Sequence, residues 1–321
     1  MHELEIKNDK ASMFYVGEKP WHGLGVKLDN PATAEQALKY AKLDFGVDIT
    51  PAKFNIGRKQ LIVPDKYVTY RTDTNAGLGV VGKGYKPLQN TDAFKFFDTL
   101  VGEGEAIYET AGVLFDGRRV WIAAKLPNSI TLKGDDIIDQ YCILSNSHDG
   151  SSSVSAFMSP IRVVCNNTLS AALSSTKNKV NVRHTTNVAK NVEMAHELLG
   201  LQNVTTKALQ EAYDVLQNKQ INKKFIEEFM EKLYPRKEET KGVTNGDRIK
   251  EAITEAFETS PGSNLRSSKG TAFGLYNGVT YYSNHAKVYS GANQRLNSIW
   301  YGGTSLVDEK AMNILLDMCK N

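Results

Sequence analysis

The sequence is poor in cysteine and has no closely spaced pair of cysteines. Its 321 residues include only Cys142, Cys165 and Cys319, with no Cys-x-x-Cys spacing. An odd number of widely spaced cysteines builds neither a disulfide framework nor a zinc site. We therefore expect free thiols, no structural metal and no cofactor.

Long apolar runs are also missing. The first ten residues carry five charged side chains and no apolar stretch, which is unlike an export signal. No segment approaches the ~20 apolar residues that a membrane-spanning helix needs. We expect a cytoplasmic protein with no membrane partner.

The sequence has no phosphate-cradling motif of the Gly-x-x-x-x-Gly-Lys-Ser/Thr type. The glycine-rich run from Gly77 to Gly84 precedes Tyr85 without an immediate helix, so it does not match a dinucleotide fingerprint. We interpret it as a twisted strand that continues through residues 83–85. The six histidines form no His-x-His or His-x-x-x-His pair, and this argues against a metal centre.

His148 and Asp149 lie beside the serines at 151–153, and three interpretations compete for them. A histidine that titrates near neutrality could serve as a general base or bind a metal. A serine hydrolase would also need a Gly-x-Ser-x-Gly elbow, which is missing. A turn built by Asn146, Asp149 and Gly150 explains the same residues more simply, and we favour it.

The pattern of the N-terminal part predicts an antiparallel sheet with a few helices. Thr33 and Gln36 form a capping-box pattern at the start of a helix over 33–42. Asp116-Gly117 and the polar run 146–153 each separate β-favouring segments, and Asp-Gly suits a type I′ turn. The sheet's other expected strands cover 61–63, 67–71, 78–81 and 161–165, and further helices are expected at 91–101 and 167–175.

The pattern changes to helical spacing after residue 187. Apolar residues recur every three or four positions over 188–199, 208–216, 225–233 and 247–258, and Asp308 is expected to cap a final helix. The predicted fold class is α+β, a hairpin-rich antiparallel sheet followed by a mainly helical C-terminal part. The predicted domains are residues 1–186 and 187–321.

Two stretches of the chain contain no acidic residue. Residues 150–192 carry a local charge of +5, and residues 259–307 carry +4, which leaves −6 for the remainder. Such segregation suits a basic face on an acidic body. Cations without acids suit a phosphate backbone, and aromatic rings among them suit unpaired bases. The nucleic-acid-binding residues that we predict are Arg162, Lys177, Lys179, Arg183, Arg266, Lys269, Tyr281, Tyr282, Lys287 and Arg295.

Each stretch also has a simpler explanation. The aromatic residues of 259–307 could form a buried core with a few exposed lysines around it. The segment around Lys177 could be a solvated connector. We predict instead that both stretches come together as one nucleic-acid surface.

Several phrases of the sequence resemble a known family. They are Trp21-His22-Gly23-Leu24-Gly25, the segment from Val81 to Asn90, Gly117-Arg118-Arg119-Val120-Trp121, the segment from Arg162 to Leu169, and the segment from Gly270 to Asn277. In these segments the chain resembles the phage/plasmid-like protein family catalogued as domain of unknown function 932. The resemblance implies DNA recombination, replication or anti-host functions on mobile elements in bacterial cells. Ser283-Asn284-His285 stands where the resemblance leads us to expect an acid beside a histidine.

Three classes of function stay open. The first is a non-catalytic, homo-oligomeric protein that binds or anneals single-stranded DNA, with RNA as an unresolved alternative. The second is a metal-dependent, nuclease-like enzyme, for which Asp135, Asp136 and Asp139 form the nearest acidic cluster. A solvated turn explains these acids equally well. The third is a host-interaction protein with no DNA role.

Overall fold

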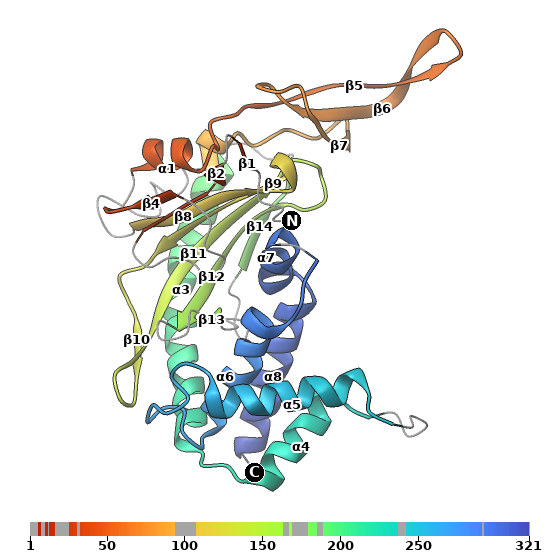
Figure 1. The fold of residues 1–321 in the computed structure, drawn as a ribbon. Helices are drawn as coiled ribbons and strands as arrows, with labels where there is room; N and C mark the ends of the chain where they lie inside the picture. Colours follow the sequence, from red (N-terminus) through yellow and green to blue (C-terminus); the bar gives the residue numbers. More distant parts are fainter. Residues whose placement is uncertain are drawn as a thin grey trace. The chain divides into compact units, whose positions relative to one another are not determined.

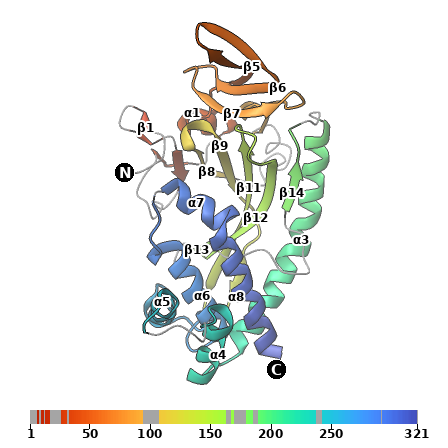
Figure 2. The ribbon, with the colours of Figure 1, turned by 90° about the vertical axis from the view of Figure 1, so that its right-hand side faces the viewer.

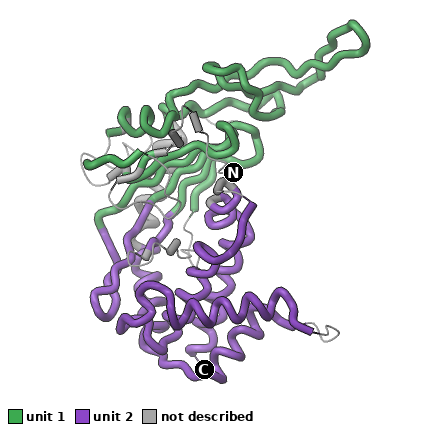
Figure 3. Tube along the Cα trace, viewed as in Figure 1, with its two compact units in different colours: residues 1–127, 142–157, 179–200 green, residues 128–141, 158–178, 201–321 purple. Residues whose placement is uncertain are grey.

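The computed structural model describes residues 6–7, 10–11, 13–16, 26–30, 33–93, 107–162, 167–168, 179–184, 189–236, 242–290 and 292–320. The chain forms two compact units from interleaved segments (Figure 3). Unit 1 comprises residues 1–127, 142–157 and 179–200, and unit 2 comprises residues 128–141, 158–178 and 201–321. The predicted domain boundary at 186/187 falls outside the described residues and stays a prediction.

Unit 1 contains a mostly antiparallel sheet whose strands follow the order β12-β11-β9-β8-β3-β4, with β14 pairing with β12. Strands β11 and β12 each contribute residues to both units. The β3–β4 pair is parallel. The strands span Met13–Val16 (β3), Val26–Leu28 (β4), Ile107–Leu114 (β8), Arg119–Lys125 (β9), Asp136–Ser147 (β11), Val154–Arg162 (β12) and Lys179–Val182 (β14).

Both predicted hairpins of this sheet are present. The N–H of Arg118 bonds to the carbonyl of Phe115, and the central residues Asp116 and Gly117 have φ of 57° and 101°. Left-handed angles at both central positions are those of the type I′ turn expected of Asp-Gly. The last strand pair is Leu114 with Arg119 and Phe115 also has a φ of 54°, so the connection comprises the four residues 115–118 instead of two. The second hairpin joins β11 to β12 through residues 148–153, so the polar run is a turn as predicted.

Helix α1 (Ala34–Tyr40) begins as its sequence predicts. The Thr33 hydroxyl accepts the Gln36 N–H at 3.3 Å, and the Gln36 side chain accepts the Thr33 N–H at 3.0 Å. This reciprocal capping satisfies two backbone donors at the helix start. Ala37 of the helix and the C-cap residue Ala41 are buried, and the core of unit 1 also includes Phe14, Leu114 and Trp121.

A second, three-stranded antiparallel sheet lies in unit 1 (Figure 1). It consists of β5 (Val47–Ile56), β6 (Lys59–Arg71) and β7 (Gly77–Gly82). The sequence predicted neither β5 nor the union of 61–63 and 67–71 into one strand. The expectation that 83–85 continues the glycine-rich strand is wrong, because β7 ends at Gly82 and a turn follows.

The remaining short strands pair locally. Strand β1 (Ile6–Lys7) pairs with β2 (Lys10–Ala11), and in unit 2 β10 (Ile130–Leu132) pairs with the start of β11. Strand β13 (Asn167–Thr168) pairs with Ile161 and Arg162 of β12. The predicted helix 167–175 is therefore wrong at its start, where backbone groups bond across strands instead. The remainder of that predicted helix, 169–175, lies outside the described residues. So do the end of the predicted strand 161–165 and most of the predicted helix 91–101.

Unit 2 is helical, as the periodicity predicts. The expected segments 188–199 and 208–216 are one continuous helix, α3, whose first part belongs to unit 1. Helices α6 and α7 were not expected from the sequence. The helices are α3 (Ala189–Asn218), α4 (Lys223–Leu233), α5 (Asn245–Thr259), α6 (Ala272–Tyr281), α7 (Ala292–Tyr301) and α8 (Gly303–Lys320), with a π-helical turn, η2 (Tyr282–Ala286), directly after α6.

Helix α6 is the centre of unit 2. Nine of its ten residues are buried, and it packs beside α8 and α5 (Figure 2). Gly274 and Gly278 lie one helical turn apart, and a Cβ at Gly278 would lie 2.9 Å from the Ile253 carbonyl oxygen of α5. Small residues at this spacing let the two helix backbones approach closely.

The start of α8 differs from the sequence prediction. The helix begins at Gly303, so Asp308 lies within it and is buried instead of capping it.

The sheets and helices together make the chain an α+β protein with a helical C-terminal part, as predicted. Among the described residues, no helix is both long and apolar enough to cross a bilayer.

Candidate nucleic-acid interface

An exposed polar row runs along β14 in unit 1. Lys179, Asn181 and Arg183 are exposed, whereas Val180 between them is buried. Successive side chains of a strand point to opposite faces, so Lys179 and Asn181 of β14 share one face, and Arg183 follows directly after the strand. Lys177, which we also predicted here, lies outside the described residues. The structure thus brings Lys179 and Arg183 together.

Arg119 of β9 lies near this row, although the sequence analysis did not select it. Partial burial of its amine and the positive charge of Arg119 both lower the pKa of Lys179. The guanidinium of Arg119 also lies 3.5 Å from the Ser151 hydroxyl, and the Lys179 amine lies 6.0 Å from the centre of the Phe157 ring. The Arg118-Arg119 doublet after the type I′ turn was the signal that could have indicated this residue.

The predicted basic residues of unit 2 fall into two environments. Arg266 and Lys269 are exposed on the connection between α5 and α6. Lys287 and Arg295 are half-buried near Tyr289: the Lys287 amine lies 5.1 Å from the ring centre, and burial lowers the pKa of Arg295. Arg162 is the last residue of β12.

The aromatic residues of 259–307 divide between core and surface. Phe273 and Tyr276 are fully buried, so the core explanation holds for these two rings. Tyr281 and Tyr282 are half-buried, and the Tyr281 ring lies 4.8 Å from the His285 ring. Partial burial raises the pKa of Tyr282. Both predicted stacking residues therefore keep part of their surface accessible.

The candidate residues are distributed over both units. Lys179 and Arg183 belong to unit 1. The described candidates in unit 2 are Arg162, Arg266, Lys269, Tyr281, Tyr282, Lys287 and Arg295. The prediction that the two acid-free stretches form one surface therefore stays a prediction.

His148 is a structural residue of unit 1. Its ring is fully buried, its Nε2 lies 2.9 Å from Asn90 Oδ1, and it packs edge-on against Phe45. Burial, helped by the nearby His184 and Arg71, lowers the pKa of His148 to about 3. Because Asn90 Nδ2 donates to the carbonyls of Leu43 and Phe45, its Oδ1 accepts from the neutral imidazole.

Asp149 organises the turn that follows His148. Its carboxylate accepts hydrogen bonds from the Ser147 hydroxyl at 2.6 Å and from the Ser151 N–H at 2.9 Å. Although partial burial opposes them, these bonds lower the pKa of Asp149. Gly150 follows with φ of 76°. The turn interpretation accounts for these contacts, and none of the hydrogen bonds between described residues joins a histidine to a serine hydroxyl in this turn.

The acidic cluster of the nuclease interpretation does not converge. Asp136 and Asp139 belong to β11 and are buried, so the expectation of a solvated turn is wrong for both. Asp136 accepts a hydrogen bond from Ser267, and Asp139 accepts one from Ser129 at 2.7 Å. Positions three apart in a strand face opposite sides. Within the described residues, no cluster of three or more His, Cys, Asp or Glu could hold a metal ion.

Asp308 lies in a buried polar cluster of unit 2. Its carboxyl group accepts a hydrogen bond of 2.9 Å from Ser283, whose carbonyl accepts the Tyr289 hydroxyl. Burial raises the pKa of Asp308 to about 8, although Ser283 and Lys287 act in the opposite direction. The acid that the resemblance led us to expect beside His285 is absent from that segment, and Asp308 of α8 bonds to Ser283 instead.

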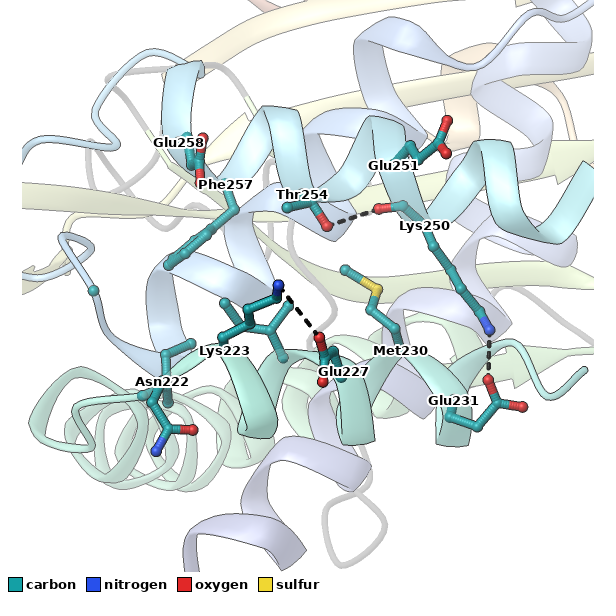
Figure 4. Close-up of a pocket in the computed structure, with 13 residues that line it drawn as sticks. Asn222, Lys223, Glu227, Met230, Glu231, Lys250, Glu251, Thr254, Phe257 and Glu258 are labelled. Carbon is teal, nitrogen blue, oxygen red and sulfur yellow. Dashed lines mark hydrogen bonds and ion pairs between the residues drawn. The ribbon is translucent and has the colours of Figure 1, made fainter. Parts of the chain in front are cut away.

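A pocket of about 750 Å³ lies between α4 and α5 (Figure 4). Ile226, Met230 and Phe257 supply apolar lining, and the lysines of the rim pair with acids: Lys250 lies 2.7 Å from Glu231, and Lys223 lies 3.9 Å from Glu227. Because Glu251 and Glu258 also line it, acids outnumber lysines four to two. This charge balance repels phosphate, so the pocket is unsuited to a nucleic-acid backbone.

The fold and these sites define an α+β protein with exposed basic residues and no converging acidic centre among its described residues. A family profile described as Domain of unknown function (DUF932) matches residues 77–300, and the chain therefore belongs to this family. Searches of curated proteins and of solved structures find no match.

Proposed function

We propose that the chain is a non-catalytic nucleic-acid-binding protein of a phage or plasmid, with single-stranded DNA as its favoured ligand. In this proposal it acts as a homo-oligomer in the cytoplasm of a bacterial host, where it protects or anneals single strands during recombination or replication. The observation that carries the proposal is the exposed row of Lys179, Asn181 and Arg183 near Arg119.

The electrostatics of this row support a polyanionic ligand. Arg119 and Lys179 repel one another, and a phosphate group near both would replace that repulsion with attraction. Each phosphate contact also releases a condensed counterion, so even a few cations contribute measurable affinity. The segment from 150 to 192 contributes no carboxylate to the row, and the acid that precedes it, Asp149, interacts with Arg119 and with the serines of its own turn.

A salt-titrated binding assay tests the proposal. Fluorescence anisotropy would follow labelled oligothymidylate of about 30 nucleotides, which exceeds one typical single-strand site, and a duplex of equal length. We expect binding that weakens steeply between about 50 and 200 mM salt. The double variant Lys179→Ala/Arg183→Ala should bind more weakly, and its salt slope should shrink by about 0.7 for each lost single-strand phosphate contact.

The matched control is Lys223→Ala/Lys232→Ala, which removes two exposed α4 lysines that pair with glutamates. It should retain the wild-type salt slope. Binding in EDTA and analysis of the DNA for cleavage separate this function from a metal-dependent nuclease. Wild-type protein that shows no salt-sensitive binding to either nucleic acid would rule the proposal out.

A further inference from the structure

The hairpin formed by β5 and β6 extends beyond its supporting strand. Strand β7 pairs with β6 only from Lys66 to Tyr70, whereas the β5–β6 pairing continues to Ile56 and Lys59. Figure 1 shows this end as a two-stranded ribbon that projects from unit 1. We call residues 53–62 the arm. A two-stranded ribbon has little stability of its own, so its length needs a reason outside the core.

The turn at the end of the arm places a cation at its tip. Ile56 pairs with Lys59, which leaves Gly57 and Arg58 as a two-residue turn. Gly57 has φ of 56°, a left-handed angle that glycine adopts without strain. Arg58 and Lys59 follow directly and are exposed. The tip is therefore positively charged.

The two faces of the arm differ in chemistry. Directly opposed residues share a face, so Phe54 and Leu61 lie on one face together with Ile56. Their exposed fractions are 44%, 42% and 61%, respectively, which makes an exposed apolar patch. Lys59 pairs with Ile56 and lies at the tip of the same face, whereas the opposite face carries the Asn55–Gln60 pair and Lys53 beside the exposed Ile62.

The charge of the arm favours a polyanion. Lys53, Arg58 and Lys59 are basic, and the sequence has no acid between Asp48 and Asp65. Two such arms would repel each other, which disfavours pairing with a second copy. The amides of Asn55 and Gln60 would lose hydrogen bonds in lipid but can bond to base edges.

We propose that the arm is a second nucleic-acid-binding element, separate from the row on β14. Arg58, Lys59 and Lys53 contact phosphates, and Phe54 stacks on an unpaired base or enters a groove with Ile56 and Leu61. This inference rests on the proposed function. A ribbon of two strands also fits the major groove of a duplex, so single and double strands are to be compared.

Two variants test the two kinds of contact. Lys53→Ala/Arg58→Ala/Lys59→Ala should lower the salt slope by about two units on a single strand and somewhat more on a duplex. Phe54→Ala should weaken single-strand binding by about 5- to 150-fold, with an unchanged slope, because stacking releases no ions. A larger loss on the duplex than on the single strand would assign the arm to a groove. Arg58→Glu, at a turn position outside the strand pairs, provides a test that does not depend on strand pairing.

The matched control is Lys223→Ala/Lys232→Ala/Lys320→Ala, which removes three exposed lysines that each have an acidic partner. It should keep the wild-type slope. Circular dichroism melts verify that each variant is folded.

Different outcomes would overturn the arm inference and the proposed function. If wild-type protein binds and the arm variants keep its affinity and slope, the arm inference is wrong while the proposed function stands. If no nucleic acid binds at all, both fall. Two further assays of the arm variants test the other partners. Sedimentation analysis measures their oligomeric state, and co-sedimentation measures their binding to anionic phosphatidylglycerol vesicles. An arm variant that loses the oligomer or vesicle binding but binds nucleic acid like the wild type would overturn the inference.

Discussion

The hydroxyl group of Ser283 lies 2.9 Å from a carboxyl oxygen of Asp308, and both residues are buried. Burial raises the pKa of Asp308 to about 8, whereas an unfolded aspartate titrates near ~4. Between these values the folded state holds more protons than the unfolded state. The contribution of Asp308 to the free energy of unfolding therefore falls as the pH rises from about 4 to 8 and is constant above that range.

Asp308→Asn should remove this contribution. The difference in stability between variant and wild type should shift in favour of the variant as the pH rises, because asparagine carries no charge to bury. Urea unfolding at several pH values from 5 to about 8 measures it. His148 has the opposite effect, because its lowered pKa makes the folded state less stable as the pH falls. Both proteins contain His148, so this effect cancels when their stabilities are subtracted. Asp317→Asn, at an exposed position of α8, is the control and should follow the wild-type pH dependence. Parallel pH profiles for Asp308→Asn and wild type would contradict the prediction.

Gly274→Ala should destabilise unit 2. A Cβ at this position would overlap the carbonyl oxygen of Ser268 and come within 3.0 Å of the Phe257 ring. Overpacking of this kind typically costs about 1–3 kcal/mol. Thermal melts compare it with Gly303→Ala at the start of α8, where a Cβ would meet no atom within 4 Å. The control should melt at or above the wild-type temperature, and equal melting of both variants would show that α6 can shift to accept a side chain.

Substitution of Tyr281 or Tyr282 by Ala distinguishes stacking from packing. Both rings are half-buried. A stacking ring should lose about 1–3 kcal/mol of single-strand binding with little change in salt slope. A ring that serves only the core should instead lower the melting temperature and leave binding unchanged. Phe273→Leu, in a fully buried position, is the control for a purely structural effect. Unaltered binding and stability in both tyrosine variants would remove these residues from the site.

Local signals predicted the longer strands of the main sheet and the amphipathic helices correctly, but not the short strands. The Thr33–Gln36 capping box and the Asp116-Gly117 turn depend on residues close in sequence, and both are present. Helix α6 escaped detection because almost all its residues are buried, so it shows no polar face from which a period could be recognised. Asp308 looked like a cap in sequence, but it lies within a longer helix and bonds to Ser283.

The candidate site was predictable only in part. The alternation around Val180 is local, and the sequence placed Lys179 and Arg183 in a basic segment. The proximity of Arg119 to Lys179 depends on the order β9-β11-β12-β14, which no local pattern reveals. The arm was missed because β5 contains Pro51 and several polar residues, which weaken a strand pattern.

The interleaving of the two units has a consequence for synthesis on the ribosome. Residues 128–141 and 158–178 emerge early, yet they belong to the unit whose helices lie in 201–321. The hydrogen bond between Asp136 and Ser267 spans 131 residues, so it forms only when most of the chain has been translated. At roughly 5–20 residues per second, synthesis of that length takes about 7 to 26 seconds, so Asp136 waits that long for Ser267. During that interval the nascent chain exposes surfaces that are later buried, and co-translational chaperones have their main opportunity to act on it.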